Sequence, residues 1–242
     1  MSEPYDRYAD TEPLFPDWAA PLYLAVSALS ATVYLGLDLF VVSMPGLALT
    51  KALGVGLLAL YAVFSRAPAL ALALALSACG DYALAMEPQR TEAGIGFFTG
   101  AHLLYIAMFA MALARHGVRK DGLILAAALA AYGGAMWVWL SPGMGDLMPM
   151  ASAYLGVILI MAAVAALVNG PRLITIGALL FVVSDSILAA GWFRGFDLRI
   201  FVDVDGALVW ITYYAAQVCL AVGIVRLKGQ HTGAPPEEVQ RL

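Results

Sequence analysis

Charged side chains are scarce in this sequence. Only 12% of its 242 residues are Asp, Glu, Lys or Arg, whereas soluble domains contain about 25% of these residues. The chain is instead 62% hydrophobic, and its mean hydropathy is +0.85. A soluble domain needs polar side chains around its core, so this composition excludes a soluble protein and indicates one that lies in lipid.

Cysteines and clusters of basic residues are also scarce. Cys79 and Cys219 each lie inside an apolar run, so we expect small buried hydrophobic side chains rather than a disulfide or a metal site. The 13 Lys and Arg residues are outnumbered by 17 Asp and Glu residues and form no basic patch. This distribution argues against nucleic acid as a partner.

Apolar segments fill most of the chain, and short breaks with Pro or Gly separate most of them. Each segment is about 20 residues long, the length that an α-helix needs to cross a bilayer. The expected helices cover residues 18–37, 45–64, 67–86, 93–115, 122–140, 148–168, 172–192 and 206–226. The pattern predicts an all-α membrane protein, a bundle of about eight transmembrane helices. Residues 1–228 would form one domain, and 229–242 a flexible polar tail.

The positions of Lys and Arg predict how the bundle is oriented, because these residues favour cytoplasmic loops. With both the N- and C-termini in the cytoplasm, nine of the 13 basic residues face that side. They are Arg7, Arg66, Arg115, Arg119, Lys120, Arg172, Arg226, Lys228 and Arg241. We expect a bacterial cytoplasmic (inner) membrane protein with this orientation.

Several expected helices carry ionisable residues, although one charge at mid-membrane costs about 2.5–3.5 kcal/mol on insertion scales. They are Lys51, Asp81, His102 and Asp185. Softer polar side chains accompany them: Tyr105, Ser184, Tyr213, Tyr214 and Gln217. Counted along helices of the predicted orientation, six of these residues fall in the exoplasmic half of the bilayer: Lys51, Asp81, His102, Asp185, Tyr213 and Tyr214. Their common depth predicts one polar cavity that opens to the exoplasmic side.

Other interpretations of these polar residues remain. Lys51 could form a structural salt-bridge network with Asp81 or Asp185. A zinc site is disfavoured because zinc usually takes three or four N, S or O ligands, and only one intramembrane His is present. A Ser-His-Asp triad is disfavoured because no G-x-S-x-G elbow occurs, and because Ser184 and Asp185 point about 100° apart on a helix. We therefore predict no metal and no cofactor.

Four segments, in this order, resemble motifs of the YhhN/lysoplasmalogenase family. They are SACGDY over 77–82, FFTGAHLLYI over 97–106, GALLFVVSDSILA over 177–189 and ITYYAAQ over 211–217. Thr50-Lys51 is similar to the family's Lys-bearing segment, although Ala52 stands where the family has Pro. The eight-helix frame and the order of these motifs extend the resemblance over nearly the whole chain.

The resemblance implies hydrolysis of the vinyl ether bond of a lysoplasmalogen, which is an alkenyl-glycerophosphoethanolamine or -choline. The products would be a fatty aldehyde and a glycerophospho-base. The expected partners are therefore a lysolipid substrate and membrane lipids. The exact lipid and headgroup, the oligomeric state and the regulation do not follow from the sequence.

The chemistry of an enol ether fits two of these residues. Hydrolysis needs an acid that protonates the β-carbon and a carboxylate that stabilises the oxocarbenium ion and activates water, as in glycosidases. We expect Asp81 and Asp185 to share this work, with the two roles unassigned. His102 would orient an Asp or the water, and Lys51 would tune an Asp or bind the lipid phosphate.

The remaining candidate residues, Tyr105, Ser184, Tyr213, Tyr214 and Gln217, are expected to contact substrate. Two other functions remain open for the same polar layer. One is a proton-coupled transporter of a small solute or lipid, and the other is a structural membrane subunit, which would have a fully paired polar layer and no cavity.

Overall fold

The computed structural model describes residues 16–40, 46–197 and 204–229. These residues form eight α-helices and contain no strand, which confirms the predicted all-α class. The helices are α1 Ala19–Leu39, α2 Leu47–Phe64, α3 Pro68–Leu84, α4 Thr91–His116, α5 Gly122–Leu140, α6 Met148–Leu167, α7 Arg172–Arg194 and α8 Val204–Gly229. Two short 3-10 helices, η1 Ser141–Gly143 and η2 Gly145–Leu147, join α5 to α6. The predicted polar tail lies outside the described residues, apart from its first residue.

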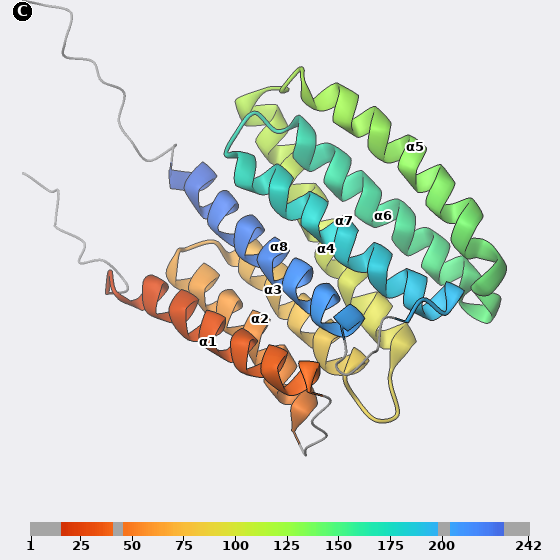
Figure 1. Cartoon of the computed structure of the whole chain (residues 1–242). Coiled ribbons are helices and arrows are strands. Elements are labelled where there is room, and N and C mark those ends of the chain that lie inside the picture. Colours follow the sequence, from red (N-terminus) through yellow and green to blue (C-terminus); the bar gives the residue numbers. More distant parts are fainter. Residues whose placement is uncertain (1–15, 41–45, 198–203, 230–242) are drawn as a thin grey trace, which may run out of the picture.

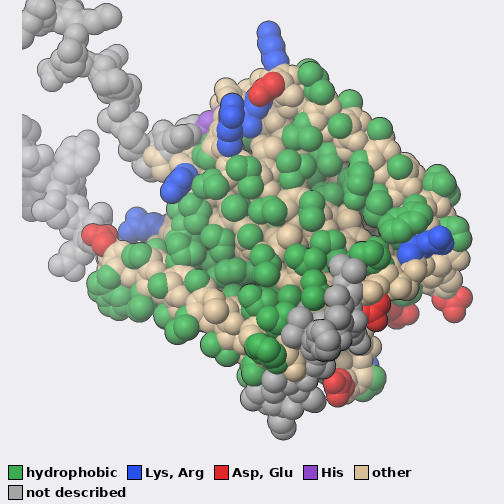
Figure 2. Space-filling model, viewed as in Figure 1, with side chains coloured by type: hydrophobic (Ala, Val, Ile, Leu, Met, Phe, Trp, Pro, Cys, Tyr) green, Lys and Arg blue, Asp and Glu red, His purple; other side chains and the backbone are tan. Residues whose placement is uncertain are grey.

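The helices have the length and the surface of membrane spans. By length and hydropathy, seven of those described qualify as spans, and the 17-residue α3 is a shorter apolar helix. Figure 2 shows a broad band of hydrophobic side chains; Lys and Arg side chains gather toward one end of the bundle, and many Asp and Glu lie toward the other. The protein is therefore an integral membrane protein. The side on which the termini lie stays a prediction.

Proline and glycine set several helix ends. Pro68 is the first residue of α3, where its missing N–H leaves no hydrogen bond unmade. Gly46, before α2, and Gly195, after α7, have φ angles of 88° and 65°, a region that favours glycine. Because these residues end the helices sharply, the connections between most consecutive helices are short.

The last helix, α8, packs against the first three helices of the chain as well as against α7. Consecutive helices from α1 to α4 are neighbours, α6 contacts α4, α5 and α7, and α8 contacts α7 and also α1, α2 and α3 (Figure 1). The bundle therefore has one side made of α1, α2 and α3 and another made of α5, α6 and α7. Helix α8 lies between them.

A glycine sets the register of α7 against α8. A Cβ atom on Gly177 would lie 2.9 Å from the carbonyl oxygen of Ala216 and 2.9 Å from the Leu220 side chain. Only glycine allows the two helices to approach this closely. Asp185 lies eight residues beyond Gly177 on α7, so this contact helps to hold the Ser184-Asp185 turn at the level of Val209 on α8, whose carbonyl oxygen accepts a hydrogen bond from Ser184.

Candidate active site

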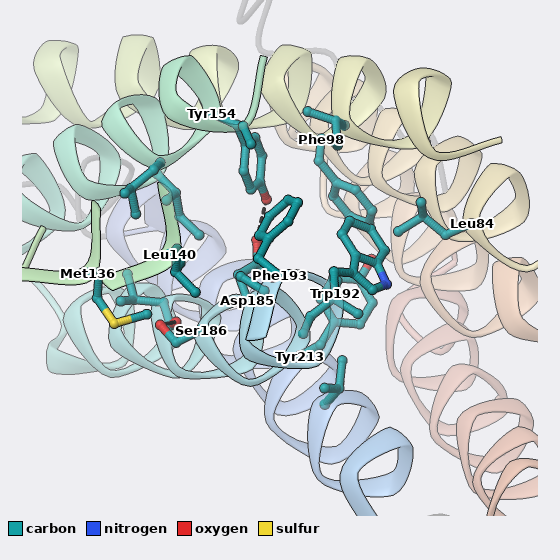
Figure 3. Close-up of a pocket in the computed structure, with 18 of the residues that line it drawn as sticks. Leu84, Phe98, Met136, Leu140, Tyr154, Asp185, Ser186, Trp192, Phe193 and Tyr213 are labelled. Atoms are coloured by element: carbon teal, nitrogen blue, oxygen red, sulfur yellow. Dashed lines mark hydrogen bonds between the residues drawn. The ribbon is translucent and has the colours of Figure 1, made fainter. Parts of the chain in front are cut away.

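Two intramembrane carboxyl groups line one cavity. The cavity has a volume of about 190 Å³, and its lining includes Asp81 from α3 and Asp185 from α7. Lys51 from α2, Tyr154 from α6 and Tyr213 from α8 also line it. Figure 3 shows Tyr154, Asp185 and Tyr213 around this space. Five helices thus contribute polar side chains to the same cavity.

The first carboxyl group is held by a tyrosine. Tyr213 Oη donates a hydrogen bond to Asp81 Oδ2 at 2.7 Å, and the Asp81 side chain is only 2% exposed. Gly80, the residue before Asp81, allows the Phe98 ring to pack closely against α3, because a Cβ on Gly80 would lie 2.7 Å from that ring. Phe98 in turn contacts the Tyr213 ring edge-on, with ring centroids 5.7 Å apart. The Gly-Asp pair thus places a carboxyl group beside an aromatic wall.

The second carboxyl group is also held by a tyrosine. Tyr154 Oη donates a hydrogen bond to Asp185 Oδ2, drawn as a dashed line in Figure 3. The same phenol lies 3.0 Å from His102 Nε2. His102 is fully buried and does not line the cavity; its hydrogen bond with Tyr154 links it to Asp185. Its Nδ1 atom has no hydrogen-bond partner among the described residues.

Sequence reasoning did not find Tyr154. One signal was present, because Tyr154 and Ser152 are the only polar side chains between Met148 and Leu167. A depth count like the one that selected the other residues also places Tyr154 in the exoplasmic half of the predicted bilayer. A lone tyrosine in an apolar helix is more often interfacial packing than a ligand, so depth alone does not single it out.

Lys51 lies at one end of the cavity among aromatic rings. Its Nζ atom is 5.5 Å from the centroid of the Tyr34 ring and 5.8 Å from that of Trp210, which are cation–π distances. Trp210 is fixed by a 3.0 Å hydrogen bond from its Nε1 to the Ala31 carbonyl oxygen. Within the part of the chain that the structure describes, Lys51 forms no salt bridge. The structure therefore does not show the salt-bridge network considered above.

Four predicted substrate contacts lie outside the lining of this cavity. Ser184 Oγ donates to the Val209 carbonyl oxygen at 3.0 Å, and Tyr214 Oη shares a 2.7 Å hydrogen bond with Ser27. Tyr105 Oη donates to Gln217 Oε1 at 2.8 Å, and both side chains are fully buried. These four side chains form hydrogen bonds within the packed bundle instead.

The positions of these side chains also concern the two sites disfavoured above, the zinc site and the Ser-His-Asp triad. The described residues contain no group of three or more His, Cys, Asp or Glu side chains that could hold one metal ion. Ser184 and His102 have different hydrogen-bond partners, Val209 and Tyr154, so they do not form a triad with Asp81. What remains is a pair of carboxyl groups on separate helices.

Two carboxyl groups in one cavity can in chemical terms supply a general acid and a general base. In each carboxyl group a tyrosine binds Oδ2, which leaves Oδ1 available to face the cavity. One carboxylic acid and one carboxylate in a partly dry cavity can deliver a proton, stabilise a cation and activate water.

Comparisons with known proteins place the chain in a family. Searches of curated proteins and of solved structures gave no match. The model of the YhhN family matches residues 46–224, which include Lys51, Asp81, Tyr154, Asp185 and Tyr213 of the cavity. This match covers well over half of the sequence, and the chain therefore belongs to the YhhN family.

Proposed function

We propose that this protein is an intramembrane hydrolase, a lysoplasmalogenase, that cleaves the vinyl ether bond of a single-chain ether phospholipid. The observation that carries the proposal is the pair of carboxyl groups, Asp81 and Asp185, in one cavity with Lys51. Membership of the YhhN family, which is associated with lysoplasmalogenase activity, supports it. The products are a fatty aldehyde and a glycerophospho-base.

The reaction begins with proton transfer to carbon. One carboxylic acid gives its proton to the β-carbon of the vinyl ether, and the electron pair of the double bond forms the new C–H bond. The positive charge is then shared by the α-carbon and the ether oxygen. The second carboxylate stabilises this oxocarbenium ion, as one carboxylate does in glycosidases.

Water completes the reaction. The carboxylate takes a proton from water, whose oxygen bonds to the α-carbon and forms a hemiacetal. The hemiacetal loses its hydroxyl proton as the C–O bond to glycerol breaks, and the glycerol oxygen gains a proton. One water molecule is consumed, and proton exchange with solvent restores the acid and the carboxylate.

The surrounding residues have supporting roles. Tyr213 and Tyr154 fix the orientation of Asp81 and Asp185 by their hydrogen bonds. Lys51 provides a cation for the lipid phosphate at the edge of the same cavity. The cavity would open toward the exoplasmic half of the membrane in the predicted orientation.

The test is aldehyde release from an alkenyl lysolipid by the purified protein. We expect Asp81→Asn and Asp185→Asn each to reduce kcat by about 100-fold or more, the usual contribution of general acid–base groups. Asp146→Asn, an exposed carboxylate on η2, is the matched control and should keep wild-type turnover. Near-wild-type turnover by both folded cavity variants would overturn the proposal.

The transporter hypothesis is tested with the same protein. Proteoliposomes with an imposed proton gradient would accumulate solute or lipid if the aspartates couple transport to protons. Our proposal expects aldehyde release without a gradient and no gradient-driven uptake. Uptake that depends on Asp81 or Asp185, with no aldehyde formed, would replace the hydrolase by a transporter.

A further inference from the structure

The cavity has one apolar end, which we call the apolar arm. It is lined by residues of α5, η1–η2, α6 and α7, namely Met136, Leu140, Met144, Ala151, Ala189 and Phe193. These six residues form a hydrophobic cluster of their own, separate from the main core of the bundle. A second apolar cluster that lines a cavity, rather than filling the bundle centre, is suited to hold a hydrocarbon chain.

The opposite end of the cavity is polar. Lys51 and Trp210 lie there, and both also line a second cavity of about 370 Å³. The second cavity has Asp38, Asp197 and Asp205 in its lining. The two cavities thus meet at a cation, and charged side chains continue beyond it.

The two carboxyl groups lie in sequence between these ends. Asp81 is on α3, which packs against the Lys51 helix α2. Asp185 is on α7, and Ala189 and Phe193 follow it at i+4 and i+8 on the same helix face. In Figure 3, Asp185 lies between Met136 and Leu140 on one side and Tyr213 on the other. The order is therefore Lys51, Asp81, Asp185, apolar arm.

We propose that the lipid binds across this cavity in one direction, with its phosphate at Lys51 and its hydrocarbon chain in the apolar arm. This direction makes Asp185 the proton donor and Asp81 the carboxylate that faces the cation. The proposal rests on the proposed function, because it assigns the parts of the substrate to the parts of the same site.

The assignment follows from the order of atoms in a vinyl ether lipid. From headgroup to chain, the order is phosphate, glycerol, ether oxygen, α-carbon, β-carbon and alkyl chain. The β-carbon, which receives the proton, lies on the chain side and therefore next to Asp185. The ether oxygen and the α-carbon, which share the positive charge, lie on the Lys51 side and therefore next to Asp81.

The apolar arm can be tested by shortening it. Ala189→Phe places a ring in the arm, so we expect kcat/KM for a 16-carbon alkenyl chain to fall by about tenfold or more relative to an 8-carbon chain. The matched control is Val183→Phe on the same helix, because Val183 is 46% exposed on the outer surface. It should leave the ratio between the two chain lengths unchanged. Equal loss for both chain lengths, or no loss, in this variant and in a second arm variant overturns the proposal.

A second variant guards against misfolding. Ala151→Leu narrows the arm from α6 with a smaller side chain, and it should shift chain preference in the same direction. Elution of each variant as a single species in detergent establishes that it is folded. If wild-type protein releases no aldehyde from either chain length, the proposed function itself fails. If it does, and both arm variants keep the wild-type ratio, only the direction of binding fails.

The roles of the two carboxyl groups are tested with a cationic ligand. The probe is a lysophospholipid analogue in which a secondary ammonium replaces the ether oxygen, so that it carries the charge of the oxocarbenium ion. We expect Asp81→Asn to weaken binding of the probe by about tenfold or more, and Asp185→Asn by less than about threefold. Calorimetric titration of the detergent-solubilised protein measures both. A larger loss in the Asp185 variant overturns the assignment.

Discussion

Removal of one hydroxyl group from Tyr154 tests the link between His102 and Asp185. Tyr154 Oη donates to Asp185 Oδ2 and lies 3.0 Å from His102 Nε2, so Tyr154→Phe breaks two polar contacts at once. The ring remains to fill its place beside Phe193 and Asp185 (Figure 3). The change is therefore almost purely one of hydrogen bonding.

The size of the effect follows from what each contact contributes. A hydrogen bond to a charged group contributes about 1.5–3 kcal/mol, which equals about 10- to 150-fold in kcat if the bond orients Asp185 in the transition state. His102 is fully buried, and its Nδ1 already has no partner among the described residues. Leaving Nε2 unpartnered as well should lower the free energy of unfolding by about 1–3 kcal/mol.

The assay is single-substrate kinetics of aldehyde release together with thermal unfolding in detergent. Tyr105→Phe is the matched control, because Tyr105 is fully buried and donates one hydrogen bond to Gln217, yet does not line the cavity. We expect it to lower stability and to leave kcat within about twofold of wild type. If the two variants have the same kcat, Tyr154 does not act on Asp185 and the interpretation is refuted.

Three further predictions concern other parts of the molecule. Lys51→Met should raise KM for a phosphate-bearing lysolipid by about tenfold or more while changing kcat much less, since it removes a charge that binds phosphate; a fall in kcat alone would contradict this. His102→Asn should reduce kcat less than Tyr154→Phe in the same kinetic assay, because the hydrogen bond with Tyr154 links His102 to Asp185. Gly177→Val should lower the free energy of unfolding by about 1–3 kcal/mol, because a Cβ on residue 177 would lie 2.9 Å from the Ala216 carbonyl oxygen. The control is Gly96→Val, where a Cβ would meet nothing within 4 Å, and equal unfolding temperatures of the two variants would contradict the prediction.

The helices themselves were predictable from the sequence because lipid imposes a simple rule. Every backbone polar group must be bonded within the segment, so an apolar run of about 20 residues becomes a helix. The predicted 122–140 agrees with α5 at both ends, and 148–168 agrees with α6 to one residue. The largest difference is in α8, which begins at Val204 and extends to Gly229, whereas the predicted helix covered 206–226. There, charged residues such as Asp205 and Lys228 continue the helix beyond its apolar part.

That Lys51, Asp81, Asp185 and Tyr213 lie at one level was also predictable, and all four line one cavity, but the direction in which the other polar side chains point was not. Depth follows from counting residues along a helix at 1.5 Å per residue. Ser184 and Asp185 show what counting leaves out: they are adjacent, yet Asp185 lines the cavity and Ser184 is bonded to the Val209 carbonyl oxygen of α8. Tyr213 and Tyr214 differ in the same way, since Tyr213 binds Asp81 and Tyr214 binds Ser27.

The apolar arm shows a stronger limit on inference from sequence. Met136 and Leu140 lie on α5, which is hydrophobic on all sides, so nothing in its pattern separates a cavity-lining face from a lipid-facing one. In a soluble enzyme an apolar patch of this kind would stand out against polar surroundings. In a membrane bundle the surroundings are equally apolar, and only the packing of α5 against α6 and α7 identifies the arm. The proposed direction of substrate binding, and with it the separate roles of Asp81 and Asp185, depends on residues of the apolar arm. Hydropathy cannot distinguish these residues from the other apolar residues of the bundle.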